Sequence, residues 1–180
     1  MKRILIVVAM QTDFVDGALG TSEAVAILEN VTAKIKAYAH DPDGVILVTY
    51  DTHAENYMET SEGKYLPVPH CVKGTAGWAL HPAVAAALEG VAYTPVEKPT
   101  FGSVALPALV KEAAAGEDFA VELIGLCTDI CVVSNALLLK AAFPEVDMSV
   151  DAACCAGVSP ASHQAALTTM ACCQITVTNN

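Results

Sequence analysis

The sequence predicts an α/β protein with one doubly wound domain over residues 1–180, built on a mostly parallel six-stranded sheet with helices on both faces. Strand-like apolar runs alternate with helical patterns along the chain, which is typical of a parallel sheet. Several of these runs are continuous and rich in β-branched residues, as expected for strands covered on both faces. A length of 180 residues suits one domain with a full core.

Six strands and five helices are expected in alternating order. The strands are predicted at residues 3–9, 44–50, 91–96, 119–126, 147–150 and 174–178. The helices are predicted near 22–38, 81–88, 104–115, 129–142 and 159–171. Ser22 and Glu23 favour the start of the first helix, and Ser159 with Pro160 has the pattern of an N-cap and first turn. This order is Rossmann-like, and ligands of such folds bind beyond the carboxyl ends of the strands.

Composition excludes several classes of function. Nine basic and twenty acidic residues give a formal net charge of −11, which argues against nucleic acid or an anionic membrane surface as a partner. No apolar run approaches the ~20 residues of a membrane-spanning helix. The opening "MKR" leads directly into a strand, without the apolar region of a signal peptide. We therefore expect a cytoplasmic protein. Its seven cysteines form no CxxC motif, and most are expected to be small buried hydrophobes.

The long segment from Asp51 to Trp78 has little periodicity, and such a segment in a compact domain is usually functional. Asp51 follows the second predicted strand, and the D-x-H spacing lets Asp51 and His53 reach one point on a turn. His70 is flanked by prolines in "PVPHC", and Glu62 could be a fourth ligand. Two imidazoles and a carboxylate suit Zn²⁺, Fe²⁺ or Mn²⁺. The alternative is a loop whose histidines hydrogen-bond its backbone.

A cysteine follows the buried strand in "IGLCTDICVVSNALLLKAAF". Cys131 is predicted in the first turn of the next helix, where backbone N–H groups and the helix dipole stabilise a thiolate. The same N–H groups can hold an oxyanion. The alternative is a packed thiol, and Cys127, which is closer to the strand, fits that alternative better.

Lys98, in "VEKPTFGS", follows another strand. A lysine there is often only solvated, but beside a thiol it could lower the pKa of the thiol and relay protons. Because the three features follow different strands at the same edge of the sheet, we expect a cysteine nucleophile, a lysine and a metal in one crevice.

The stretches "QTDFVDGALG", "DTH", "LPVPHCVKGTAGW", "EKPTFGS" and "GLCTDICVVSNALLLK" resemble the isochorismatase-like cysteine hydrolases, and most closely their nicotinamidase branch. The resemblance covers nearly the whole chain. It implies a doubly wound sheet, an aspartate–lysine–cysteine triad, and hydrolysis of nicotinamide or a related small amide to an acid and ammonia. It also implies one divalent metal ion, with zinc expected and iron or manganese as alternatives. A homo-oligomer is compatible with it.

The resemblance assigns roles to individual residues. It makes Cys131 the nucleophile, Lys98 the triad lysine, and the amides of Cys127 and Cys131 the oxyanion donors, after a cis peptide at Leu126–Cys127. The implied metal ligands are Asp51, His53, Glu62 and His70. The implied pocket residues are Phe14 and Phe101, with Leu66 and Pro67 where family members often carry an aromatic residue, which makes nicotinamide itself less secure as the substrate.

The position of the triad aspartate holds Ala9, whereas Asp13 occupies the family's own "DF" position. An isolated apolar replacement in an otherwise intact site indicates an inactivated variant, engineered or naturally lost, whose activity is abolished or low. One alternative is a natural non-catalytic protein that binds a small molecule. Another is a hydrolase of a different small amide or of isochorismate, although the intact "TDICV" weighs against isochorismate.

Overall fold

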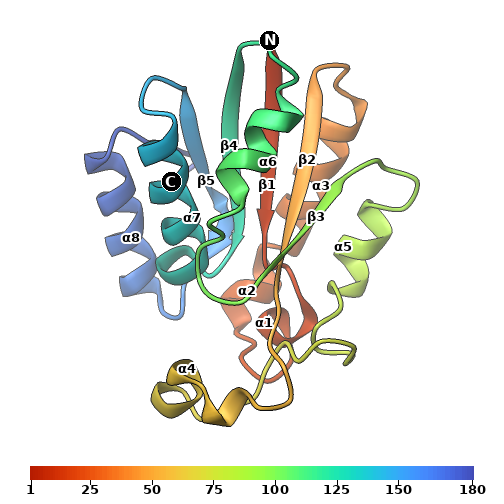
Figure 1. Cartoon of the computed structure of the whole chain (residues 1–180), viewed down its shortest axis with the longest axis vertical. Helices are drawn as coiled ribbons and strands as arrows, with labels where there is room; N and C mark the ends of the chain where they lie inside the picture. Colours follow the sequence, from red (N-terminus) through yellow and green to blue (C-terminus); the bar gives the residue numbers. More distant parts are fainter.

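A six-stranded, wholly parallel sheet forms the centre of the computed structural model, which describes residues 1–180 (Figure 1). The strand order is β3-β2-β1-β4-β5-β6. The strands are β1 (Lys2–Val8), β2 (Gly44–Asp51), β3 (Thr94–Lys98), β4 (Phe119–Leu126), β5 (Met148–Ala156) and β6 (Thr176–Thr178). The predicted fold class is confirmed, and all five strand pairs are parallel rather than most of them.

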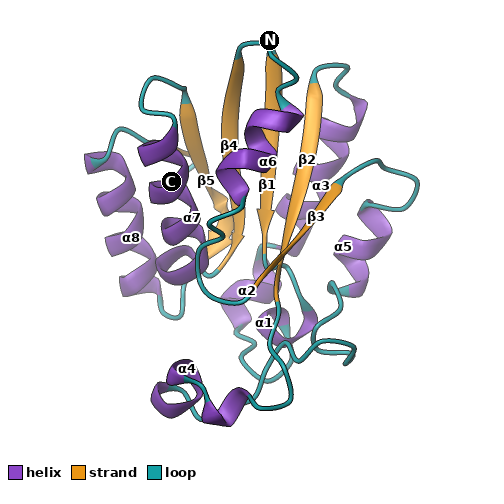
Figure 2. Cartoon of the chain, in the orientation of Figure 1, coloured by secondary structure: helices purple, strands orange, loops and turns teal.

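The longer helices form two layers, one on each face of the sheet, whereas α4 lies beyond the carboxyl edge of the sheet (Figure 2). The helices are α1 (Thr12–Val15), α2 (Ser22–Ala26), α3 (Leu28–His40), α4 (Ser61–Tyr65), α5 (Pro82–Ala87), α6 (Leu106–Ala113), α7 (Val133–Ala142) and α8 (Pro160–Cys172). Helix α3 packs with α5, whereas α6 packs with α7 and α7 with α8. The chain moves outward from β1 in both directions with right-handed crossovers, which places the two groups on opposite faces. No helix combines the length and the apolar character needed to cross a membrane.

Several elements differ from the prediction. The strand expected at 91–96 is β3 at Thr94–Lys98, and the short helix α1 was not expected. The helix expected at 22–38 is two helices, α2 and α3, and Thr21 caps the first by accepting a hydrogen bond from the Ala24 amide. The segment after Asp51 contains a 3-10 turn (Tyr57–Glu59) and α4. Strand β5 continues to Ala156 instead of ending near residue 150. Alanine and cysteine carry little β-propensity, so pairing with β4 rather than local sequence extends this strand.

The ends of β1 and β4 approach each other closely at the carboxyl edge of the sheet. Gly125 of β4 has φ +118°, and a Cβ there would lie 2.2 Å from the carbonyl oxygen of Val8. The pairing of β4 with β5 also shifts register between Leu123 and Gly125. Only glycine fits this position, and the turn that follows β4 depends on it.

We predict that Gly125→Ala lowers the free energy of unfolding by at least about 3 kcal/mol, because the added methyl group collides with backbone. Gly90→Ala is the matched control, since Gly90 also has a positive φ but open space around a Cβ. It should cost only about 1–2 kcal/mol, the conformational cost alone. Urea unfolding measures both, and equal losses would contradict the steric account.

Candidate active site

The last residues of two strands and the turn after a third meet at the carboxyl edge of the sheet. Asp51 ends β2 and Lys98 ends β3, and the two are register partners. Cys131 lies in the turn after β4. The Nζ atom of Lys98 lies 3.2 Å from Asp51 Oδ1 and 3.3 Å from Cys131 Sγ. The structure therefore brings together the thiol, the lysine and the first predicted metal ligand.

Lys98 is only 1% exposed, and its ammonium group also donates to the carbonyl oxygen of Thr100 at 3.1 Å. Burial lowers the pKa of Lys98, but the neighbouring Cys131 and Asp51 outweigh burial and raise it above its usual value. The lysine is therefore a buried cation beside the sulfur rather than a solvated side chain.

Cys131 occupies a π-helical turn (Thr128–Val132) instead of the first turn of an α-helix, and α7 begins only at Val133. The Val132 amide donates to the Cys127 carbonyl across this turn at 3.1 Å. The peptide Leu126–Cys127 is cis, as the resemblance implies. Such single π-helical turns are frequent at functional sites.

The thiol of Cys131 is 4% exposed. Burial raises its pKa and Lys98 lowers it, and the net result is a pKa of about 11. The sequence predicts the effect of the lysine but not the opposing effect of burial. Burial therefore favours the protonated thiol and Lys98 favours the thiolate, so a group that accepts the proton would assist attack on a substrate.

Four side chains next to this pair form a buried cluster of metal-ligand type. One ligand atom from each of Asp51, His53, Glu62 and His70 lies within 4.8 Å of the others. Asp51 Oδ2 is 3.0 Å from His53 Nε2 and 3.5 Å from His70 Nε2. Glu62 Oε1 is 3.7 Å from His53 Nε2 and 3.5 Å from His70 Nε2.

These separations fit a metal centre. Ligands about 2.0 Å from zinc at tetrahedral angles lie about 3.3 Å apart, which is close to all four distances. His70 Nδ1 lies 2.8 Å from the Val68 carbonyl oxygen, a contact that orients the ring and directs Nε2 toward the cluster. The buried Asp/His/Glu/His set can hold a divalent ion.

The electrostatics of the cluster also favour a cation. Burial raises the pKa of Asp51, but His53, His70 and Lys98 outweigh it and hold the pKa well below its usual range. Burial lowers the pKa of His70, but the bonds to Asp51 and Glu62 raise it to about 10. Both pKa shifts have the same cause, because positive charge between the two carboxylates is favourable.

Two residues near the end of β1 hold the segment that carries the metal-ligand cluster in place. The fully buried side chain of Gln11 accepts from the Asp51 amide at 2.7 Å and donates to the Asp51 carbonyl at 2.8 Å. Asp13 accepts from the Cys71 amide at 2.8 Å, next to His70. Sequence reasoning gave neither residue a role here. A polar "QTD" after an apolar strand is the only signal that could have identified them.

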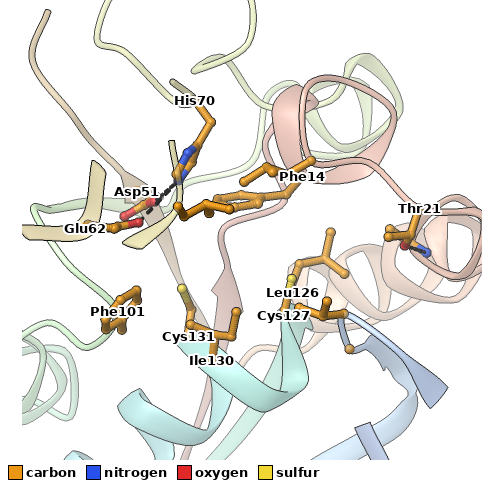
Figure 3. A pocket seen from close by; sticks show the side chains of 15 residues that line it. Phe14, Thr21, Asp51, Glu62, His70, Phe101, Leu126, Cys127, Ile130 and Cys131 are labelled. Atoms are coloured by element: carbon orange, nitrogen blue, oxygen red, sulfur yellow. Dashed lines mark hydrogen bonds and ion pairs between the residues drawn. The ribbon is translucent and has the colours of Figure 1, made fainter. Parts of the chain in front are cut away.

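A cavity of about 260 Å³ connects the cluster with the thiol (Figure 3). Its lining residues, two-thirds of them hydrophobic, are Phe14, Leu19, Thr21, Ala24, Asp51, Glu62, Leu66, His70, Phe101, Leu126, Cys127, Ile130, Cys131, Gly157 and Val158. In Figure 3, Asp51, Glu62 and His70 gather on one side, and Cys131 points toward them from the turn after β4. Of the predicted pocket residues, Phe14, Phe101 and Leu66 line the cavity, whereas Pro67 is exposed and does not.

Ala9 follows β1, is fully buried and is not among the residues that line the cavity. Its amide donates to the Thr49 carbonyl oxygen at 3.1 Å, which fixes it against β2. Its φ is +46°, in the left-handed region where aspartate and asparagine are enriched among non-glycine residues. The backbone at this position therefore suits an aspartate better than it suits alanine.

The fold and the side chains at its edge define a class, a doubly wound α/β protein with a thiol, a lysine and a cluster of metal-ligand type at the carboxyl edge of the sheet. The chain belongs to the isochorismatase family, because the isochorismatase domain model matches residues 3–180. It is 31% identical over 147 residues to an uncharacterized isochorismatase family protein PncA of Bacillus subtilis (strain 168), which covers 76% of this chain and 78% of that protein.

Solved structures with a similar fold include nicotinamidases and pyrazinamidases. The pyrazinamidase/nicotinamidase of Streptococcus mutans UA159 is 27% identical, with a TM-score of 0.84 over 98% of this chain and 99% of that one. Nicotinamidase/pyrazinamidase PncA of Bacillus subtilis is 24% identical, with a TM-score of 0.84 over 98% and 99%. The pyrazinamidase of Pyrococcus horikoshii, solved in complex with zinc, is 23% identical, with a TM-score of 0.80 over the full length of both chains.

We predict that the chain, incubated with Zn²⁺ and desalted, retains about one ion per molecule by elemental analysis. His70→Ala should weaken binding at least about 100-fold, since even outer partners of ligands contribute 10–100-fold. His40→Ala is the control, because His40 is exposed at the end of α3. Failure to retain Zn²⁺, Fe²⁺ or Mn²⁺ would contradict the metal site.

Proposed function

We propose that this protein is an amide hydrolase of the nicotinamidase type, which converts nicotinamide or a related small carboxamide to its acid and ammonia. One observation carries the proposal. Cys131 Sγ lies 3.3 Å from the ammonium group of Lys98, and the thiol faces a largely apolar cavity that also contains the Asp/His/Glu/His cluster. The nucleophile, the lysine that stabilises its charge and the cavity that can hold a substrate are thus adjacent.

In this mechanism the sulfur of Cys131 attacks the amide carbon. A carbon–sulfur bond forms, and the carbonyl electron pair moves to the oxygen, which the amides of Cys127 and Cys131 would stabilise. The thiol proton passes to the amide nitrogen, the carbon–nitrogen bond breaks, and ammonia leaves. Water then cleaves the thioester to give the acid and restore the thiol. Lys98 stabilises the thiolate during these steps.

The cluster of Asp51, His53, Glu62 and His70 would hold a divalent ion, with zinc expected and iron or manganese as alternatives. When bound, the ion would supply a Lewis acid for a heteroatom of the substrate or for water. Three of these residues, Asp51, Glu62 and His70, line the same cavity as the thiol, which supports this arrangement.

The cavity supports a small and largely apolar carboxamide as the substrate. Its volume of about 260 Å³ is at the low end for ligand pockets. Phe14 and Phe101 could pack against a ring. Leu66 offers no aromatic face, so other small amides remain candidates beside nicotinamide.

We also propose that Ala9 occupies the place of the triad aspartate and that activity is therefore low. The only carboxylate that contacts Lys98 is Asp51, whose second oxygen is engaged by the histidines. Asp51 is therefore not free to carry the thiol proton to the leaving nitrogen. The same feature favours the second candidate, a natural non-catalytic protein that binds a small amide or its acid. Hydrolysis of isochorismate is a weaker alternative, because it would leave the Cys131–Lys98 pair without a role.

We predict that Ala9→Asp raises ammonia release by roughly 10²–10⁴-fold, the usual contribution of a positioned acid–base group. Ala9→Asn is the matched control, because it has the same shape and backbone preference but cannot carry the proton. The readout is ammonia released from nicotinamide and a panel of small amides by zinc-loaded protein. An Ala9→Asp protein that is folded, metal-loaded and inert on the whole panel would overturn the hydrolase in favour of the binding protein.

A further inference from the structure

Helix α8 packs against the cysteine turn, and His163 makes a side-chain hydrogen bond to it. We propose that His163 is a positioning residue, which holds the turn Cys127–Cys131 so that its backbone amides point at the oxyanion of the reaction. This inference rests on the proposed function. His163 does not line the cavity and does not touch Cys131, so any role in the reaction must pass through the turn.

The contact is short and reaches the middle of the turn. His163 Nδ1 lies 2.7 Å from Thr128 Oγ1. Thr128 is fully buried and directly follows the cis peptide Leu126–Cys127. Its carbonyl accepts the Val133 amide, which starts α7. A displacement of Thr128 would therefore turn the peptides on both of its sides.

The loop between β5 and α8 fits closely against this pair. A Cβ on Gly157 would lie 2.8 Å from the Cβ of His163, so only glycine lets the loop pass the histidine. The Val158 amide donates to both carboxylate oxygens of Asp129, at 3.2 and 3.3 Å. The turn is thus joined to the loop at Asp129 and to helix α8 at the adjacent Thr128.

His163 itself is held by the start of α8. Ser159 and Ser162 form a capping box immediately before it, and Pro160 occupies the first turn. Burial lowers the pKa of His163 and Asp129 opposes this, with a net lowering. A neutral imidazole presents one acceptor and one donor nitrogen, so Nδ1 can accept a hydrogen bond from the Thr128 hydroxyl group.

A positioning role has a specific consequence. Backbone donors stabilise an oxyanion only when they lie about 2.7–3.1 Å from it, whereas a planar amide in the ground state demands less of them. Loss of the His163 contact should therefore weaken binding of a tetrahedral adduct much more than binding of a planar ligand. A residue that only stabilised the fold would affect both ligands alike.

The experiment compares pyridine-3-carbaldehyde with nicotinamide by calorimetry on the zinc-loaded full chain. The Cys131 sulfur adds to the aldehyde carbon, the carbonyl electron pair moves to the oxygen, and the thiol proton ends on that oxygen. No group leaves, so Ala9 does not prevent the reaction. Cys131→Ala should abolish this adduct and confirm its site.

We predict that His163→Leu weakens aldehyde binding about ten-fold, which is a smaller effect than the loss of a direct oxyanion donor. The same variant should weaken nicotinamide binding by less than about two-fold. His163→Asn should retain most of the affinity, because its side chain places a polar atom near the position of Nδ1. Thr128→Val, which removes only the hydroxyl, should behave like His163→Leu and serves if that variant does not fold. Parallel losses for both ligands, or His163→Asn as weak as His163→Leu, would overturn the proposal.

Hydrogen exchange separates failure of this proposal from failure of the proposed function. If the unaltered chain binds neither ligand, the nicotinamidase-type function is wrong. In that case the peptide covering residues 126–133 decides the structural claim. Faster exchange there in His163→Leu, but not in His163→Asn, supports the positioning role. Unchanged exchange in both variants overturns it.

Discussion

The buried ammonium group of Lys98 is the interaction on which the site depends. A lysine that is 1% exposed would be strongly destabilising without partners, because removing an ion from water costs several kcal/mol. Asp51, Cys131 and the Thr100 carbonyl supply those partners. They come from β2, from the turn after β4 and from the loop after β3. One cation therefore holds three elements of the carboxyl edge together.

Asp51 extends this arrangement to the metal-type cluster. One of its oxygens contacts Lys98, and the other lies between His53 and His70. Gln11 fixes the backbone of Asp51 from both sides. The thiol and the cluster are consequently parts of one charge network and cannot be rearranged independently. Ala9 takes no part in this network, so an apolar residue at that position does not disturb the contacts of Lys98 and Asp51.

Much of this could be predicted from the sequence, because the carboxyl ends of parallel strands share one edge. The predicted strand endings place Asp51, Lys98 and Cys131 at one edge, where the structure also has them. The remaining features depend on contacts between distant segments. The extension of β5 follows from pairing with β4, and the split at Ile27 has no local breaker.

The chemistry of the thiol was also harder to predict than its position. Helix-start geometry and a lysine predict an acidic thiol, but burial reverses the net shift and raises the pKa of Cys131 to about 11. Burial of one side chain cannot be obtained from spacing along the chain. The contact between Thr128 and His163 could not be predicted from the sequence either, because the two residues are 35 positions apart.

The most direct test of this account is a double-mutant cycle between Lys98 and Asp51 in metal-free protein, measured as free energies of unfolding in urea. Asp51→Asn alone leaves a buried cation without its counter-charge and should cost about 3–5 kcal/mol. The same change should cost less once Lys98→Met is present. The account predicts that the double variant is more stable than the summed single losses by at least about 1 kcal/mol. Losses that add within about 0.5 kcal/mol would contradict it.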